Sequence, residues 1–177
     1  KEVRNEMTTK AGQKCTAIRR IVVPENLIGD VQHALSKALD QTKIGNPLSR
    51  ETRMGSLVGK QQYDEVVRKI NLLKAETELI YDGKHELVDA DYENGAFMSP
   101  KLFLNDKPFE KNISHDVEAF GPVSTLMPYK DAEEAAALAK RGKGSLVGSI
   151  VSHDNNFVAE TSWKMASQHG RIFVLNR

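Results

Sequence analysis

The stretch K-A-G-Q-K-C-T (residues 10–16) lies between a polar helical pattern and an apolar run, and it contains the only cysteine of the chain, Cys15. Gly12 allows the backbone to turn tightly where a side chain would clash. The charge of Lys14 favours a thiolate if the two groups lie close together. These features suit a nucleophilic cysteine, whereas a lone cysteine is more often a small buried hydrophobe. Local chemistry leaves both interpretations open.

Composition excludes several classes of protein. The 177 residues are typical of one domain. Lys and Arg number 25 against 24 Asp and Glu, so a net charge of +1 gives no electrostatic reason to expect nucleic acid or a membrane surface as a partner. A single cysteine forms no internal disulfide and no Cys-based zinc site, which suits a reducing cytoplasm. No apolar run approaches the roughly 20 residues that span a bilayer.

Both ends of the chain lie inside predicted elements. The chain opens on Lys1 within a helical pattern, with Val3 and Met7 on one face, and stops at Arg177 after a strand-like run at residues 172–175. Natural termini are usually loose and polar. We therefore expect residues 1–177 to be a fragment of a longer protein.

Strand patterns alternate with helix patterns along the chain. Apolar, β-branched runs predict strands at residues 18–24, 77–83, 123–129, 145–151 and 171–175. Apolar residues spaced about one turn apart predict helices at residues 25–44, 60–75, 132–141 and 155–168, the last two capped by Asp131 and Asp154. Residues 96–104 read as a strand interrupted at Pro100 and placed at a sheet edge, and residues 107–122 as irregular. The pattern predicts an α/β fold with a largely parallel sheet flanked by helices.

Metal and phosphate sites find little support in the sequence. The five histidines, at positions 33, 85, 115, 153 and 169, form no H-x-x-x-H or H-E-x-x-H pair, so we predict no metal site. R-G-K-G-S (residues 141–145) follows a predicted helix instead of preceding one, which indicates a helix end and turn instead of a phosphate loop. No G-x-G-x-x-G follows a strand.

Taken in order, the loops resemble the catalytic domain of the aldehyde dehydrogenase superfamily. G-Q-K-C (residues 12–15) is similar to the G-Q-x-C nucleophile motif, and G-N-P with M-G-S-L-V (residues 54–58) to the G-N-P and M-G-P-L-V segments. G-A-F-M-S-P (residues 95–100) resembles G-x-F-x-x-P-T, and E-A-F-G-P-V (residues 118–123) resembles the E-x-F-G-P-V motif that reaches the cofactor. Residues 144–154 and a closing strand ending at Asn176 resemble the last landmarks. The likeness runs the full length of the chain.

The resemblance implies a role for three residues. Cys15 would attack the aldehyde carbon to give a thiohemiacetal, whose oxyanion is held partly by the Cys15 backbone N–H. Hydride transfer to a nicotinamide cofactor, NADP or NAD, would leave a thioester that water hydrolyses. Glu118 would hold the nicotinamide-side ribose, with Phe120 packed against it. The chain departs from the family pattern at Val117, where a second acid is usual, at Ser56 in M-G-S, and by one extra residue in the run 170–176.

The sequence K-A-G-Q-K-C-T-A-I-R-R-I (residues 10–21) resembles that of a narrower branch of the superfamily. That branch oxidises semialdehydes attached to coenzyme A in aromatic-acid breakdown, and it includes the dehydrogenase half of the bifunctional ring-opening proteins of phenylacetate degradation, which also carry a hydratase-like domain. The resemblance implies an aldehyde substrate, possibly linked to coenzyme A, and a homo-oligomeric protein.

What the resemblance places upstream also matters. The family's general base, its oxyanion asparagine and its cofactor-binding domain all belong upstream of residue 1, so we expect the isolated chain to fold without being active. Two alternatives stay open: an enzyme that passes the acyl group to coenzyme A, and a non-catalytic assembly module with a buried Cys15.

Overall fold

A computed structural model of the protein describes residues 1–176. Four strands form its central sheet. They lie in the order β1 (Arg20–Pro24), β6 (Val123–Tyr129), β5 (Lys101–Leu104) and β3 (Glu78–Asp82). The first three run parallel, and β3 pairs antiparallel with β5. Two smaller sheets each hold a parallel pair, β2 (Ile44–Gly45) with β4 (Leu87–Val88) and β7 (Ser145–Val151) with β8 (His169–Leu175). The predicted α/β fold with a largely parallel sheet is confirmed.

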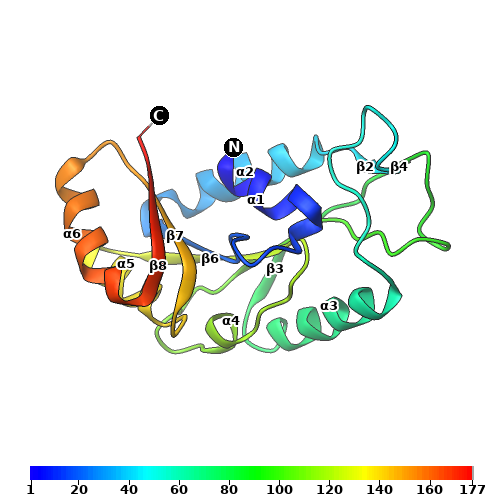
Figure 1. The fold of residues 1–177 in the computed structure, drawn as a ribbon. Coiled ribbons are helices and arrows are strands. Elements are labelled where there is room, and N and C mark those ends of the chain that lie inside the picture. The colour runs from blue at the N-terminus through cyan, green and yellow to red at the C-terminus, as the bar shows by residue number, and fades with distance from the viewer. Residues whose placement is uncertain (177) are drawn as a thin grey trace.

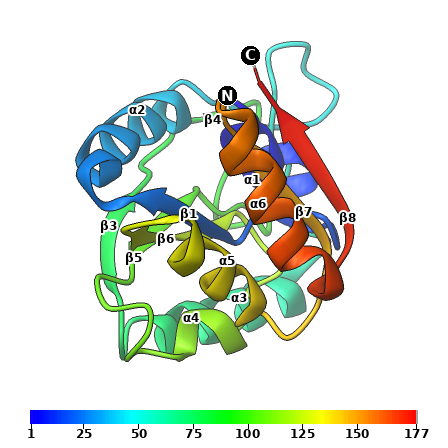
Figure 2. The same ribbon diagram turned by 90° about the vertical axis from the view of Figure 1, so that its left-hand side faces the viewer.

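Helices cover both faces of the central sheet (Figure 1). On one face lie α1 (Glu2–Thr8) and α2 (Ile28–Asp40), and on the other lie α3 (Lys60–Leu73) and the short α4 (Ile113–Asp116). The second view shows α5 (Ala132–Lys140) and α6 (Asn155–Met165) beside β7 and β8 (Figure 2). Two short 3-10 helices also occur, η2 (Glu25–Leu27) and η3 (Ala166–Gln168), and η1 (Thr9–Gly12) is a kinked turn in which Lys10 and Ala11 have left-handed backbone conformations.

Two hydrophobic cores fill the space between the sheet and its helices. One joins α3 to the sheet through residues such as Val66, Ile70 and Phe103. The other joins α1 and α2 to the opposite face through residues such as Leu39 and Leu102. Neighbouring positions on β5, Leu102 and Phe103, enter different cores because successive side chains of a strand point to opposite faces. Both are fully buried.

The predicted helix caps are confirmed. Asp131 accepts a hydrogen bond from the backbone N–H of Glu134 at 2.9 Å. Asp154 accepts from the backbone N–H groups of Asn156 at 2.9 Å and Phe157 at 3.1 Å. Each carboxylate satisfies amides that have no partner within the first helical turn, and its charge also complements the helix dipole there. These caps fix where α5 and α6 begin.

Two predictions about element boundaries are wrong. The helix expected over residues 25–44 ends at Asp40, and Ile44 instead forms β2 opposite Leu87, where it is fully buried. The strand expected at a sheet edge is β5, which lies between β6 and β3. Pro100 precedes this strand and uses its carbonyl to accept from the Gly83 amide at 3.1 Å, so its missing N–H costs the ladder nothing.

Short elements also occur in segments expected to be irregular. The span 107–122 contains α4, and β4 forms in the stretch between the strands predicted at residues 77–83 and 96–104. These elements are too short to show a hydrophobic period in the sequence, so their formation depends on tertiary packing.

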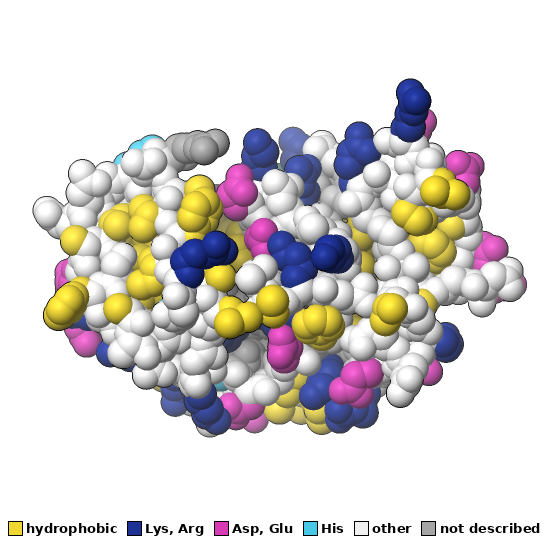
Figure 3. All heavy atoms as spheres, viewed as in Figure 1, with side chains coloured by type: hydrophobic (Ala, Val, Ile, Leu, Met, Phe, Trp, Pro, Cys, Tyr) yellow, Lys and Arg dark blue, Asp and Glu magenta, His cyan; other side chains and the backbone are white. Residues whose placement is uncertain are grey.

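An exposed apolar surface lies on the small sheet. Hydrophobic side chains gather over β7 and β8 at the left of Figure 3. Leu146, Val151, Phe173 and Val174 are the exposed large members on these strands. Within residues 1–176, no helix is both long and apolar enough to cross a membrane.

Candidate active site

Cys15 lies at the tip of a turn and is exposed. The chain reverses just before it, because Lys10, Ala11 and Gly12 all adopt left-handed backbone conformations, with φ of 53°, 52° and 72°. The turn itself is closed by the Ala17 amide, which donates to the Lys14 carbonyl at 3.2 Å. The thiol is therefore presented on a constrained loop instead of being packed in a core. The interpretation of Cys15 as a small buried hydrophobe is wrong for this chain.

Gly12 brings this loop against a segment far away in the sequence. A Cβ atom at Gly12 would lie 2.1 Å from the Gly121 carbonyl oxygen and 3.0 Å from the Pro122 nitrogen. Real Cβ atoms do not approach a backbone so closely, and the positive φ independently favours glycine. The two motifs G-Q-K-C and E-A-F-G-P thus meet backbone to backbone.

Gln13 connects a third segment to the same loop. Its side-chain oxygen accepts from the Val58 amide at 2.9 Å, and its side-chain nitrogen donates to the Lys10 carbonyl at 2.8 Å. Val58 ends the M-G-S-L-V segment, which leads into α3. One side chain therefore fixes both the turn before Cys15 and the approach to this helix.

Glu118 and Phe120 lie on the facing segment. The Glu118 carboxylate forms an ion pair with Arg19 at 2.9 Å, and its side chain is about half exposed. Phe120 adopts a left-handed conformation, with φ of 46°, that is uncommon for a residue other than glycine. Gln62, in the first turn of α3, donates to the Phe120 carbonyl at 3.0 Å. The Phe120 ring remains partly exposed.

Arg19 lies between these two segments. Its guanidinium donates to the carbonyls of Lys14 at 2.9 Å and Ala17 at 3.1 Å, which flank Cys15 on either side. Burial lowers the pKa of Arg19, and the negative charges of Glu118 and a Cys15 thiolate act in the opposite direction. The buried cation is thus held by acceptors from both segments.

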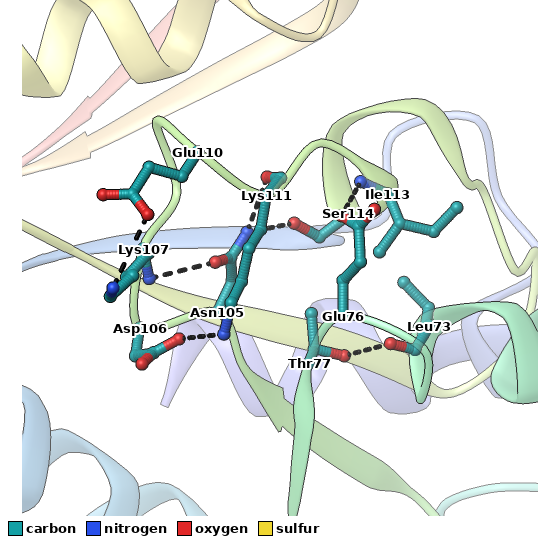
Figure 4. Close-up of polar contacts among 10 residues, drawn as sticks. All are labelled: Leu73, Glu76, Thr77, Asn105, Asp106, Lys107, Glu110, Lys111, Ile113 and Ser114. Atoms are coloured by element: carbon teal, nitrogen blue, oxygen red, sulfur yellow. Dashed lines mark hydrogen bonds and ion pairs between the residues drawn. The ribbon is translucent and has the colours of Figure 1, made fainter.

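The buried side-chain amide of Asn105 fixes the part of the chain that leads to Glu118. Asn105 is fully buried and donates to the Lys111 carbonyl at 3.1 Å and to the Ser114 hydroxyl at 2.8 Å, as Figure 4 shows. Its side-chain oxygen accepts from the Lys107 amide at 3.2 Å. These bonds fix the chain as it enters α4, which ends two residues before Glu118.

Glu76 supports the start of α4. Its carboxylate accepts from the Ile113 amide at 2.9 Å (Figure 4). Glu76 follows α3 in the chain. The start of α3 therefore contacts Phe120 through Gln62, and the chain after its end contacts the first residue of α4 through Glu76.

Sequence reasoning missed two residues of this arrangement, Arg19 and Gln62. In the sequence Arg19 is indistinguishable from its neighbour Arg20, which instead donates to the Leu138 and Ala139 carbonyls at the end of α5. Gln62 occurs in an ordinary amphipathic helix pattern. Lys14, by contrast, forms an ion pair with Glu6 at 2.7 Å.

A surface hollow of about 740 Å³ adjoins the Cys15 loop and the Glu118 segment. It is lined by the start of α3, including Val58, Gln62 and Arg68. Because Val58 binds Gln13 and Gln62 binds the Phe120 backbone, this hollow lies next to the segments that carry Cys15 and Glu118.

Three of the histidines contact backbone carbonyls outside the Cys15 loop. His85 contacts the Leu39 carbonyl at 3.0 Å, His115 the Pro108 carbonyl at 2.7 Å and His169 the Met165 carbonyl at 3.0 Å. Over the described part of the chain, no group of three or more His, Cys, Asp or Glu residues is arranged to hold a metal ion.

Known proteins resemble this chain in sequence and in fold. Residues 1–174 match the sequence model of the aldehyde dehydrogenase family. The chain is 43% identical over 178 residues to 3,4-dehydroadipyl-CoA semialdehyde dehydrogenase of Aromatoleum evansii, covering 99% of this chain and 35% of that protein. It is 40% identical over 124 residues to protein MaoC of Klebsiella aerogenes, covering 70% of this chain and 36% of that one.

The structural likeness is equally extensive. Betaine aldehyde dehydrogenase from Staphylococcus aureus, in a crystal structure with NAD+, superposes with a TM-score of 0.86 at 26% identity, over 97% of this chain and 33% of that one. The chain spans about a third of the length of the curated relatives it matches. By sequence and by fold, the chain belongs to the aldehyde dehydrogenase family.

Proposed function

We propose that this chain is the nucleophile-bearing part of an enzyme that oxidises an aldehyde to a carboxylate with NADP or NAD. The observation that carries the proposal is the meeting of the Cys15 loop and the Glu118 segment, which are joined by the Gly12–Gly121 contact and by Arg19. Cysteine and carboxylate are the groups that such a reaction requires at these two places. Because the chain spans about a third of its relatives, the activity is proposed for the whole protein that contains it.

Cys15 is proposed as the nucleophile. Its thiolate forms a bond to the aldehyde carbon, and the carbonyl electrons move to oxygen to give a thiohemiacetal. The backbone N–H of Cys15 is proposed to donate to that oxyanion. Loss of hydride from this carbon leaves a thioester, and attack by water releases the carboxylate and regenerates the thiol.

Glu118 and Phe120 are proposed to hold the cofactor. The cofactor, when bound, supplies the acceptor for the hydride. Glu118 fits this task because its side chain is about half exposed while Arg19 holds it in place through an ion pair. Its exposed carboxylate is proposed to accept from a ribose hydroxyl, and the partly exposed Phe120 ring offers a flat apolar surface to the cofactor.

The substrate class is proposed from the relatives. The 43% identity to an enzyme named for a CoA-linked semialdehyde supports a semialdehyde bound as a coenzyme A thioester, in aromatic-acid breakdown of the phenylacetate or benzoate type. Transfer of the acyl group to free coenzyme A instead of water uses the same first steps. A product assay with and without free coenzyme A separates these two outcomes.

The experiment compares wild-type full-length protein with Cys15→Ser and Glu118→Gln. We expect aldehyde-dependent reduction of NADP or NAD in the wild type, no turnover in Cys15→Ser with unchanged folding, and a raised KM for the cofactor in Glu118→Gln. Full activity in Cys15→Ser would refute the proposal. The 177-residue chain alone is proposed to be inactive, because the general base and the rest of the cofactor site are expected outside it, and clear turnover by this chain would contradict that.

We also propose a cytoplasmic homo-oligomer. The single cysteine suits a reducing compartment, and the exposed apolar side chains of β7 and β8 support a contact with a second copy. Light scattering of the full-length protein tests the oligomer, with Phe173→Glu expected to weaken it. A wild-type monomer would contradict it.

A further inference from the structure

Arg19 contacts the Cys15 loop and the Glu118 segment at once. Its Nη1 donates to the Ala17 carbonyl at 3.1 Å, and its Nη2 donates to the Lys14 carbonyl at 2.9 Å and lies 2.9 Å from Glu118 Oε1. Its guanidinium carbon lies 5.3 Å from the centre of the Phe120 ring, within the range of a cation–π contact. One side chain therefore touches both residues proposed to hold the cofactor.

The geometry requires arginine and not merely a positive charge. A guanidinium presents several N–H donors in a fixed planar fork, so it can bind two carbonyls and a carboxylate while its face stacks on a ring. A lysine ammonium would keep the charge but would not place donors on both segments and stack on Phe120 together.

Stability alone does not account for this arrangement. The Arg19 side chain is only 17% exposed, and within the described chain its Nε is buried with no hydrogen-bond partner. Burying a cation with an unsatisfied donor costs free energy. Glu118 is much more exposed and would be hydrated without its partner. The contacts of Arg19 fix the positions of the two segments at the expense of desolvation.

We propose that Arg19 is a positioning residue that holds Glu118 and Phe120 in a fixed place relative to Cys15 and thereby couples cofactor binding to the reactivity of the thiol. This inference rests on the proposed function of Cys15 and Glu118. It goes further in assigning a role to a residue outside both motifs. Arg19 pairs with Glu118 Oε1 while the Glu118 side chain stays 58% exposed, so the carboxylate is held in place and still accessible to a cofactor.

Arg20 supplies a matched control. It is adjacent in sequence and also buried, since burial lowers its pKa as well. Its guanidinium binds the Leu138 and Ala139 carbonyls at 2.8 and 3.1 Å, on the side of α5. Arg20 Nη1 also lies 3.3 Å from His115 Nδ1 on α4. Arg20→Met therefore removes a buried cation that binds neither the Cys15 loop nor the Glu118 side chain.

Cofactor affinity is the first measurement, made on the full-length protein with Arg19→Met, Arg19→Lys, Glu118→Gln and Arg20→Met. We expect the KM for the cofactor to rise about tenfold in Arg19→Met, because the ion pair that orients Glu118 is lost. Arg19→Lys should show a similar rise because the fork is lost. The double variant Arg19→Met with Glu118→Gln should be little worse than Glu118→Gln alone, since both act through one carboxylate. Arg20→Met should leave this KM unchanged.

Alkylation of Cys15 by iodoacetamide is the second measurement, and it needs neither cofactor nor turnover. Arg19→Met should change the alkylation rate at neutral pH severalfold, because the Lys14 and Ala17 carbonyls on either side of Cys15 lose the guanidinium that holds the loop. Arg19→Lys should change the rate in the same way, because an ammonium cannot bind both carbonyls in one planar fork, and Glu118→Gln should leave it unchanged. A purely structural role would instead give Arg19→Met and Arg20→Met the same profile in both assays.

The outcomes separate this inference from the proposed function. If the wild type oxidises aldehydes but the effects of Arg19→Met and Glu118→Gln on the cofactor KM multiply, the coupling through Arg19 is refuted. An unchanged KM and alkylation rate in Arg19→Met would refute it as well. If Cys15→Ser keeps full activity, the proposed function fails, whatever the alkylation rates show.

Discussion

The backbone of Gly12 lies directly against the carbonyl of Gly121, so closely that a Cβ atom at Gly12 would be 2.1 Å from that oxygen. This contact places the loop before Cys15 on the segment that follows Phe120. Neither glycine contributes a functional group, yet the distance between the proposed nucleophile and the proposed cofactor residue depends on their approach.

Gly12→Ala should therefore destabilise the protein and remove its activity. The substitution adds a clash with backbone atoms to the cost of a positive φ, and together these should lower the free energy of unfolding by about 2–4 kcal/mol. Urea denaturation measures this loss. Gly29→Ala is the control, because nothing lies within 4 Å of a Cβ there and the residue is helical, so it should be neutral or stabilising by up to about 1 kcal/mol. Equal stability of the two variants would show that the close approach is absent.

Gln13 allows the two bonds of its amide to be separated. Gln13→Glu keeps an oxygen for the Val58 amide but loses the donor to the Lys10 carbonyl, whereas Gln13→Met loses both. We expect a loss of about 1 kcal/mol for Gln13→Glu and about twice that for Gln13→Met, by the usual net value of a hydrogen bond. Hydrogen exchange of the Val58 amide provides a direct measurement, and it should quicken only in Gln13→Met. Faster exchange in both variants would contradict this assignment.

Asn105 should be among the costliest polar residues to replace. Asn105→Ala removes a fully buried amide and leaves the Ser114 hydroxyl and the Lys107 amide without their partner, for an expected loss of about 2–4 kcal/mol. Thermal and urea unfolding measure the loss. Asn94→Ala, at an exposed site whose side chain donates to Asp91, should cost less than about 0.5 kcal/mol. If the two cost the same, the buried network contributes nothing.

His115 should make stability depend on pH. Burial, with the nearby charges of Arg20 and Arg141, lowers the pKa of His115 below its usual value. The unfolded chain therefore binds the proton more readily, so His115 contributes stability above about pH 6.5, and this is lost as the pH falls from there toward the folded-state pKa. We expect unfolding between pH 7.5 and 5.5 to become easier in the wild type and to change less in His115→Gln. The slope with pH, not the absolute stability, is the quantity to compare, and parallel slopes would contradict the assignment.

Sequence patterns predicted most of the fold because most elements here are long enough to show a period. The stripe on α3 and the β-branched run of β6 are examples, and β6 has the predicted bounds, residues 123–129. Ile44 shows where a local sequence pattern fails to predict the structure. It continues the apolar pattern of α2, and only its place opposite Leu87 makes it a strand residue. The position of β5 inside the sheet likewise depends on which strands pair, which no local pattern records.

The candidate site divides in the same way. The motifs singled out Cys15, Glu118 and Phe120, and the structure brings the segments that carry them together, while their roles stay a prediction. Arg19 could not be found, because its importance depends on which way it points: one residue later, Arg20 binds the far side of the sheet. Adjacent residues near a strand face opposite directions, but which of them faces the site depends on the register of β1 against β6.

The pairing of β1 with β6 also has a consequence for synthesis. Arg20 pairs with Thr125, and the neighbour of β1 in the sheet is β6, so β1 stays without its partner until residues 123–129 have been made. Contacts between segments so distant in sequence close late in folding, because the intervening chain must first be ordered. Cys15 is therefore synthesised well before β6, but its loop receives its final shape only when β6 has joined β1.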